Sequence, residues 1–336
     1  MSRTRLARTI RFSSTVATAC AVAMLWASAA AQTAQNPPAP ARPPAAAPVP
    51  ATSPLTTAWG VPNLEGIWIS GDTTPVETPD PSDQTSLAAL SKWFPGNDFT
   101  SEKTATTDPV VQYPPSKRRA LITEPSTGRL LIKQKAIDER DYNLVHLLDS
   151  YANHTLWERC ISRGAPLLPA PYDAAYQILQ TPDQIAIFYE LLHVTRIIPI
   201  SDQPRVMSNI KQWFGEPRAH WEGKTLVVDS VNFRDKTILG SATTSRRLRG
   251  LPHSEKLHTI ERFTRSADGT IHYEVLINDP ETYETSWVAS FDLLAPPSSY
   301  QILESACHEG NEYMPAALRG ARVEEGTIQS KRPERR

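Results

Sequence analysis

The sequence predicts a mainly β fold, in which an antiparallel meander follows one helix and closes into a lipocalin-like barrel or folds into a sandwich. From residue 174 onward, apolar and polar residues alternate with a period of two, the pattern of half-buried strands. Short runs of Gly, Pro, Asn and Asp separate these segments, which favours hairpins between consecutive strands. No βαβ pattern is present, because the single long helical pattern precedes the strands.

The elements before residue 174 are expected to be few. Residues 59–70 resemble a strand that opens the domain, and residues 71–116 are rich in Pro, Asp, Ser and Thr, which predicts long irregular structure with one short helix near 87–93. Residues 134–157 carry good helix formers with apolar residues at helical spacing. We expect this main helix to end near Cys160, before turn-forming residues 163–166.

The segment after residue 174 holds the predicted strands. They are 174–180, 184–191, 193–200, 218–222, 225–231, 257–265, 270–277, 285–293 and 299–306. Closure into a barrel or sandwich removes the exposed edges of such a meander. The alternation puts Tyr273 on the same face as Ile271 and Val275, but the sequence leaves open whether the charged strand residues face a lumen or the solvent.

The ends of the chain predict export. Residues 1–31 combine a basic start, an apolar stretch near 16–26 and a small-residue ending, the pattern of a secretory signal peptide. Residues 32–58 contain eight Pro and eight Ala, which predicts a disordered linker. A β-barrel domain is then expected over 59–325, followed by a charged tail at 326–336. The expected location is periplasmic or secreted, with no membrane span after signal cleavage.

Composition narrows the class of partner. The formal net charge is −1, so no broad basic surface is available for nucleic acid. The expected partner is a small-molecule ligand or substrate, and the oligomeric state stays open. The mature chain would keep two of the three cysteines, Cys160 and Cys307. In an exported protein this favours a disulfide between them over two buried free thiols.

Several motifs occur in a distinctive order. They include Trp-Glu-Arg-Cys at 157–160, Gln-Thr-Pro at 180–182, His-Trp-Glu-Gly-Lys-Thr-Leu-Val-Val-Asp at 220–229, and Ala-Cys-His-Glu-Gly-Asn at 306–311. With these motifs the chain resembles a family of secreted bacterial proteins that are usually labelled only as hypothetical. The resemblance covers roughly 59–325. It supports the domain limits and implies no mechanism.

Established catalytic motifs are missing from the sequence. It has no Gly-x-Ser-x-Gly, no phosphate-binding loop and no Gly-x-Gly-x-x-Gly, so no cofactor is expected. His308 and Glu312 are spaced like the histidines of a zincin helix, but the second ligand is a glutamate and Gly310 interrupts the segment. No metal ligands are therefore assigned.

The candidate catalytic residues are histidines and carboxylates able to move protons. They are His193, Glu261, Glu274, His308 and Glu309. If the strand residues among them face a water-poor lumen, burial and neighbouring charge would separate their pKa values, as acid–base chemistry requires. The alternative is ordinary ion pairing on the outer face. His308 and Glu309 follow the last predicted strand and could share one site if Gly310 turns the chain.

The candidate substrate-binding residues combine charge with aromatic surface. They are Arg159, Tyr189, Arg196, Trp221 and Asp229. A bridge between Cys160 and Cys307 would bring Arg159 near His308, an arrangement suited to a carboxylate on a ligand.

Three functional classes stay open on these residues. The first is an exported enzyme of lyase, isomerase or cyclase type that works by acid–base chemistry in a barrel pocket. The second is a hydrolase, with or without a metal. The third is a non-catalytic periplasmic ligand-binding protein. The first requires His193, Glu261, Glu274 and His308 to meet at one cavity.

Overall fold

The computed structural model describes most of the chain after residue 53. The described residues are 54–70, 74, 76–78, 118–162, 166, 168, 175–205, 209–235, 238–239 and 250–327. The predicted signal peptide, the linker up to residue 53, the short helix near 87–93 and the tail from 328 lie outside them. The chain divides into two units, 1–47 and 48–336, and the described residues all belong to the second.

A four-stranded antiparallel sheet has the order β1-β3-β4-β5. Its strands are β1 (Gly66–Ile69), β3 (Ala175–Gln180), β4 (Gln184–Tyr189) and β5 (Val194–Pro199). The tight turn between β3 and β4 is fixed by Thr181, whose hydroxyl donates to Asp183 Oδ1 at 2.6 Å and accepts from the Gln184 amide at 3.1 Å. Local turn chemistry therefore sets the register of this hairpin.

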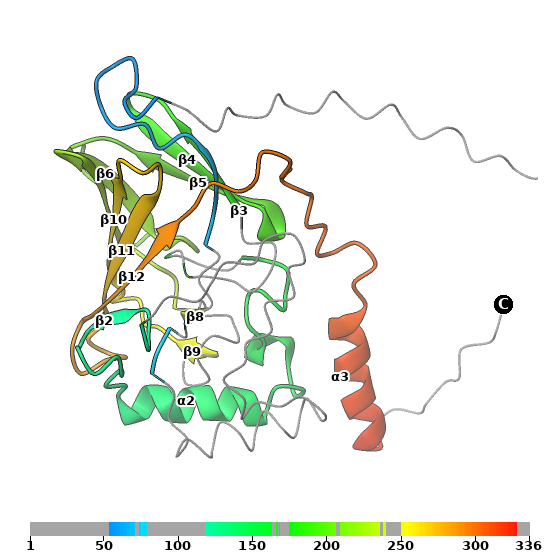
Figure 1. Ribbon diagram of the computed structural model, residues 1–336. Helices are drawn as coiled ribbons and strands as arrows, with labels where there is room; N and C mark the ends of the chain where they lie inside the picture. Colours follow the sequence, from blue (N-terminus) through cyan, green and yellow to red (C-terminus); the bar gives the residue numbers. More distant parts are fainter. Residues whose placement is uncertain are drawn as a thin grey trace, which may run out of the picture. The chain divides into compact units, whose positions relative to one another are not determined.

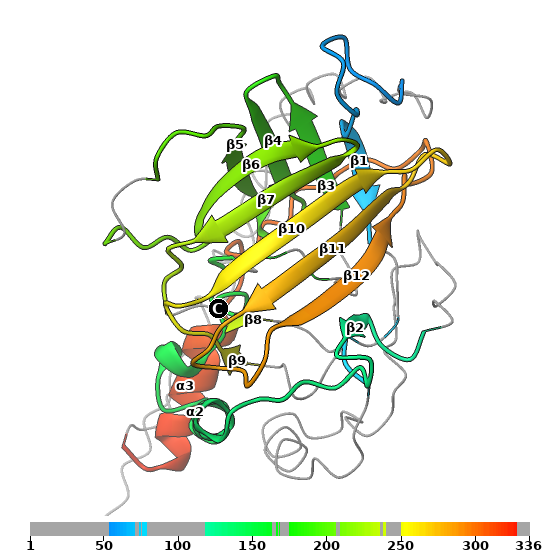
Figure 2. The same ribbon diagram turned by 90° about the vertical axis from the view of Figure 1, so that its left-hand side faces the viewer.

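A six-stranded antiparallel sheet has the order β2-β12-β11-β10-β7-β6 and faces the viewer in Figure 2. Its strands are β2 (Ile122–Glu124), β6 (Glu216–Glu222), β7 (Thr225–Val231), β10 (His258–Arg265), β11 (Ile271–Asn278) and β12 (Trp287–Leu293). Two short strands, β8 (Ile238–Leu239) and β9 (Leu251–Pro252), pair separately. The fold is thus mainly β, as the sequence predicts.

The two large sheets enclose the core between them. In the view of Figure 2 the four-stranded sheet lies behind the six-stranded one, and residues from both sheets form one buried apolar cluster that includes Trp68, Tyr176, Phe263 and Trp287. Single bridges connect the sheets at two places. Ile200 pairs with Ala219 beside β5 and β6, and the last residue of β1 pairs with Leu294 just after β12.

Two α-helices are present among the described residues, α2 (Gln134–Val145) and α3 (Tyr313–Glu324). α2 packs against β9 near one end of the sheets (Figure 1). The expected helix over 134–157 is too long, because a turn follows Val145 and Ser150 then caps a short 3-10 helix, η1 (Tyr151–Asn153). Neither described helix has the length and apolar character needed to cross a membrane.

The C-terminal part differs from the sequence prediction. Residues 299–306 form extended chain without a strand ladder, so the ninth predicted strand is wrong, whereas the eight predicted strands between 174 and 293 are all present. Helix α3 was not expected. Its Arg322 holds it to the turn after α2 by donating to the carbonyl oxygens of Leu148 and Asp149. Side-chain contacts, not strand pairing, therefore position this end of the chain.

Candidate functional site

A buried ion pair lies between the two sheets. Arg196 on β5 and Glu261 on β10 approach to 2.6 Å between Nη2 and Oε2, and their side chains are only 1% and 0% exposed. Both positions fall on the inward face of their strands, since the alternation that buries Ile198 and Phe263 also buries them. The pair therefore joins the four-stranded sheet to the six-stranded sheet through charge.

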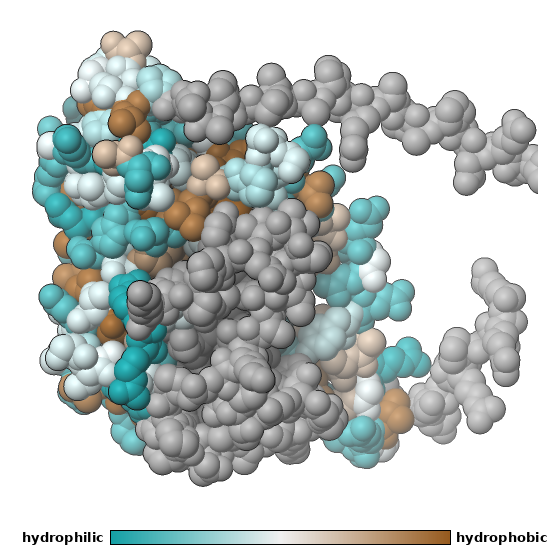
Figure 3. All heavy atoms as spheres, viewed as in Figure 1, coloured by the Kyte–Doolittle hydropathy of each residue, from teal (hydrophilic) through white to brown (hydrophobic). Residues whose placement is uncertain are grey.

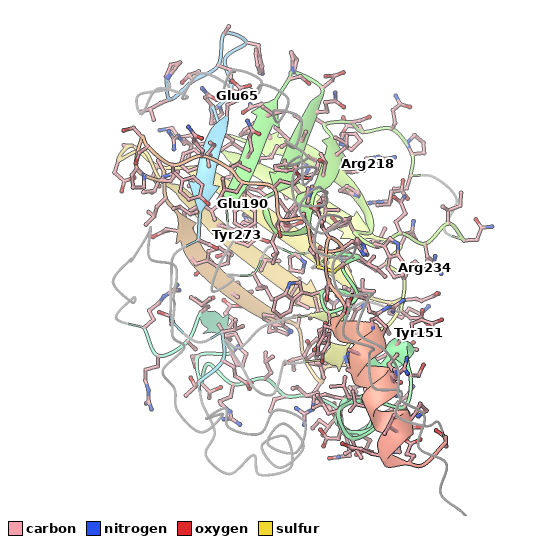
Figure 4. The ribbon with its side chains drawn as sticks, turned by 90° about the vertical axis from the view of Figure 1, so that its right-hand side faces the viewer. Glu65, Tyr151, Glu190, Arg218, Arg234 and Tyr273 are labelled. Carbon is pink, nitrogen blue, oxygen red and sulfur yellow. A yellow bond between two sulfur atoms is a disulfide. The ribbon has the colours of Figure 1, made fainter. Side chains whose placement is uncertain are left out.

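Hydroxyl groups from neighbouring strands complete this buried cluster of Arg196, Glu261, Tyr273, Ser230, Tyr189 and Thr259. Tyr273 on β11 donates to Glu261 Oε1 at 2.9 Å, and Arg196 Nη2 donates to Ser230 Oγ on β7 at 2.9 Å. Figure 4 labels Tyr273 on the inner side of its sheet, below Glu190. The cluster thus draws on five strands of the two sheets, β4, β5, β7, β10 and β11.

Burial sets the protonation of the cluster. Desolvation raises the pKa of Tyr273 well above its usual range, and the charge of Glu261 adds to the effect. The pKa of Tyr189 is also raised by burial, against the opposing charge of Arg196. Desolvation acts to lower the pKa of Arg196, but the nearby Glu261 outweighs it and holds the guanidinium charged. Both tyrosines therefore stay neutral beside a charged arginine.

Several polar groups of the cluster lack a hydrogen bond of normal geometry. They are Nε and Nη1 of Arg196, the hydroxyl of Tyr189, the hydroxyl of Thr259 on β10, and Oε2 of Glu261, whose close contact is the ion pair with Arg196. A buried polar group left unpaired costs about 1–3 kcal/mol. Such groups in a native core are usually completed by water, an ion or a ligand. The cluster therefore offers surplus donors inside an apolar core.

The structure brings three of the ten candidate site residues into this cluster. Glu261, Arg196 and Tyr189 lie in the interior, and Trp221 on β6 packs against the edge of the same core. Glu274 and Asp229 do not join them, because each occupies an outward position of its strand. Glu274 faces Arg262 in the β10–β11 register, and Asp229 Oδ2 lies 2.9 Å from His258 Nε2.

The histidine candidates also lie away from the cluster. His193 ends the 3-10 helix η2 (Leu191–His193) after β4, where its Nε2 contacts exposed Glu304 at 3.2 Å. His308 and Glu309 sit in an exposed turn before α3. The expected meeting of His193, Glu261, Glu274 and His308 at one cavity is therefore wrong. Strand alternation separates the two glutamates, and both histidines lie outside the strands.

The predicted disulfide between Cys160 and Cys307 is present, with a Cα–Cα distance of 5.6 Å. It places the turn that holds His308 beside the segment 155–160. Arg159 in that segment stacks over the ring of Tyr151 at 5.2 Å. The guanidinium thus contacts an aromatic ring, and no contact between it and His308 was found among the described residues.

Glu190 secures the extended C-terminal segment. Its carboxylate, just beyond β4, accepts from the Tyr300 hydroxyl at 2.5 Å, from the Leu303 amide at 2.8 Å and from the Ala175 amide at 3.3 Å (Figure 4). Glu190 is only 2% exposed. These contacts replace the strand pairing that the sequence pattern predicts for 299–306.

Sequence reasoning did not single out Tyr273, Thr259 and Ser230 as site residues. The sequence does carry a signal, because Tyr273 alternates with the apolar residues Ile271, Val275 and Ile277 of β11, and Glu261 shares a face with Phe263 of β10. A hydroxyl or carboxylate on such a face needs a buried partner. Assigning each strand residue to the inward or outward face therefore predicts that Tyr273 and Glu261 are buried polar residues. The pairing of Arg196 with Glu261 cannot be predicted in this way, because it depends on how the two sheets face each other.

The outer face of the six-stranded sheet is polar. His220 and Arg262 both contact Glu222, and His272 pairs with Asp292. In Figure 3 hydrophilic residues predominate on the side where Figure 1 shows this sheet, with apolar residues in small separate patches. The described residues contain no group of three or more His, Cys, Asp or Glu placed to hold a metal ion.

No family model, curated protein or solved structure matches this chain. The resemblance to secreted bacterial proteins therefore stays a prediction, and the functional argument rests on the buried cluster.

Proposed function

We propose that this protein is an exported small-molecule-binding protein whose ligand lies between the two sheets, against the buried cluster. The observation that carries the proposal is the guanidinium of Arg196, which is fully buried and has two nitrogens, Nε and Nη1, without a hydrogen bond of normal geometry. A ligand oxygen would complete these donors and remove the cost of leaving them unpaired.

The chemistry of the cluster indicates a class of ligand. Glu261 already balances the charge of Arg196, so no second full charge is required. Its Oε2 faces Arg196, and the groups left for a ligand are two guanidinium nitrogens, which donate, and two hydroxyls, which can donate or accept. A carbonyl or carboxyl oxygen meets this need. Edge-to-face aromatic pairs, such as Phe263 with Tyr273, supply apolar walls for the body of the ligand. The favoured ligand is therefore a small, largely apolar molecule with one such oxygen.

Closure of the two sheets into one lipocalin-like barrel belongs to this proposal. Support comes from the two single bridges between the sheets, Ile200 with Ala219 and Ile69 with Leu294. Export is supported by the disulfide, since such bonds persist in oxidising compartments.

The proposal is tested by removing one hydroxyl. Thr259→Val keeps the shape of the side chain but deletes an unpaired polar group of the cluster. Thr195→Val, on the exposed face of β5 beside Arg196, is the matched control. A panel of small aliphatic and aromatic carboxylic acids and ketones is screened by thermal shift and then by calorimetry. We expect affinity to fall about tenfold in Thr259→Val, equal to about 1.4 kcal/mol, and to be unchanged in Thr195→Val.

Two results would count against binding between the sheets. One is the absence of any thermal shift across the panel together with a bare chain mass in native mass spectrometry. The other is an equal loss of affinity in both threonine variants, which would place the ligand elsewhere.

A second candidate function is an enzyme of lyase, isomerase or cyclase type at the same cluster. The observation that favours it is the hydrogen bond from Tyr273 to Glu261 in a site without water contact, where burial raises the tyrosine pKa. A neutral tyrosine beside a carboxylate can pass a proton to or from a bound molecule. No feature of the described residues favours the hydrolase alternative.

Tyr273→Phe separates the two candidates. An enzyme would lose turnover of a bound molecule in this variant while keeping its affinity within a few-fold. If the wild-type protein returns its ligand chemically unchanged after long incubation, as judged by mass spectrometry, the enzyme candidate is excluded and the binding function remains.

A further inference from the structure

A polar cleft of about 340 Å³ lies apart from the buried cluster. Three walls come from α2, from the end of β9 with the segment that follows it, and from the turn after β11, and Asp235 lines the cleft beside them. The lining residues are Lys135, Ala136, Glu139, Asp235, Pro252, His253, Ser254, Glu255, Lys256, Glu281 and Thr282. None of these residues belongs to the cluster between the sheets, so the cleft is a separate place for a ligand.

The walls of the cleft are held by hydrogen bonds. Asp279 accepts from the amide and the hydroxyl of Ser254, both at 2.7 Å, and from the Thr282 hydroxyl at 2.7 Å. Lys133, just before α2, donates its amide to the Thr282 carbonyl at 2.9 Å and its ammonium to the Pro280 carbonyl at 2.8 Å. The three walls are therefore connected before any ligand arrives.

His253 gives the cleft a buried acceptor. The residue is 4% exposed, and its Nδ1 lies 3.0 Å from the Ser254 carbonyl oxygen. A carbonyl oxygen can only accept, so Nδ1 carries the proton and Nε2 presents a lone pair. Nε2 has no hydrogen-bond partner among the described residues. Burial lowers the pKa of His253, so the ring is neutral at pH 7 and Nε2 stays an acceptor.

The charges of the cleft favour a positively charged ligand that donates hydrogen bonds. Of the described lining residues, four are carboxylates (Glu139, Asp235, Glu255, Glu281) and two are lysines (Lys135, Lys256). Lys211 contributes one further positive charge through its ion pair with Glu255 at 3.7 Å. The other three carboxylates still outnumber the two lining lysines, and the neutral imidazole of His253 adds no positive charge.

We propose that this cleft binds a small organic amine, whose ammonium group donates to Nε2 of His253 and pairs with Glu139 or Glu281. An ammonium has three donors and no acceptor, which matches an acceptor lone pair in a cleft whose lining carboxylates outnumber its lysines. Lys135 and Lys256 also line the cleft, so a ligand that carries a carboxylate as well as its amine is compatible with it. The proposal is independent of the ligand between the sheets.

The test compares probes of one length and different charge on the purified protein. Butane-1,4-diamine, 4-aminobutanoate and butanoate are titrated by calorimetry. Glu139→Gln removes one carboxylate of the cleft, and Asp138→Asn removes the neighbouring exposed carboxylate of the same helix, which does not line the cleft. We expect the diamine to bind the wild-type protein. Its affinity should fall about threefold in Glu139→Gln, the size expected for one exposed ion pair, and should not change in Asp138→Asn.

A second readout reports on His253 directly. In histidine labelled with ¹⁵N, an amine that donates to Nε2 shifts the resonance of that nitrogen, whereas an amine bound only by surface carboxylates does not. Binding of butanoate in preference to both amines would overturn the proposal, as would the absence of binding by either amine. An equal loss in the two carboxylate variants, or an unshifted Nε2 resonance at saturation, would overturn it as well.

Discussion

Glu261 is the residue on which the buried cluster most depends. It provides the only described counter-charge in contact with the Arg196 guanidinium, in a place that water does not reach. Breaking a buried pair by neutralising one partner leaves the other charge uncompensated, which costs about 3–5 kcal/mol. We therefore expect Glu261→Gln to lower the free energy of unfolding by about this amount in urea titrations.

The control for this substitution lies on the adjacent strand. Glu274→Gln makes the same chemical change on the outward face of β11, where we expect an effect within about 0.5 kcal/mol. Equal effects of the two substitutions would show that the Arg196–Glu261 pair contributes no more than a surface charge. At the residue scale, the inward or outward side of a strand thus decides what a glutamate does.

The turn after β11 is an element held by one carboxylate. Asp279 accepts from Ser254, Thr282 and the Glu281 amide. Burial works to raise its pKa, since the residue is 1% exposed, but these hydrogen bonds outweigh it and hold the pKa below the usual value of about 3.9. A lowered folded-state pKa stabilises the fold above pH 4, and this contribution is lost as the pH falls through the folded-state value.

Asp279→Asn tests this element. We expect it to cost about 1–3 kcal/mol at pH 7, where charge-assisted hydrogen bonds are lost. The difference from the wild type should shrink as urea titrations move from pH 4 toward pH 2. Glu284→Gln, an exposed change nearby in the chain, should leave stability nearly constant. A pH-independent difference for Asp279→Asn would mean that the charge of Asp279 is not involved.

The sequence pattern predicts elements better than it predicts contacts between them. Strands from 174 to 293 follow from alternation and turn residues, because both are local signals. Helix α3 has a proline at position 315, within its first turn, and follows a Gly-Asn pair, which masks its pattern. Residues 299–306 alternate like a strand but are held by Glu190 and by the pairing of Glu304 with His193. Such partners come from more than 100 residues away, where sequence spacing gives no signal.

The candidate site was predicted in part for the same reason. Arg196, Glu261 and Tyr189 are charged or aromatic residues on core-type strands, which is a local property that the sequence shows. His193, His308 and Glu309 have suitable chemistry, and only the arrangement of the turns around them shows that they are exposed. Face-to-face packing of two sheets is the piece of information that a single sequence does not contain.

At the scale of the whole molecule, one covalent bond joins distant parts of the chain. Cys160 and Cys307 are 147 residues apart, and closing a loop of that length restricts the unfolded chain. We expect the double variant Cys160→Ser/Cys307→Ser to lose about 2–5 kcal/mol of stability by urea titration. Wild-type protein unfolded under reducing conditions should match the variant. Full stability in the variant would show that the bond adds no constraint.

The same disulfide closes a covalent loop, or ring, of the chain from Cys160 to Cys307. Strands β3 to β12 all lie within the loop of residues 160–307 that the disulfide closes. Strands β1 and β2 precede this loop in the sequence. Those two strands pair with ring strands, β1 with β3 and β2 with β12. During synthesis the ring cannot close until the ribosome has added Cys307, by which point every strand of the two large sheets has been made. Oxidation can therefore close this loop only after all the residues of the two large sheets have been synthesised.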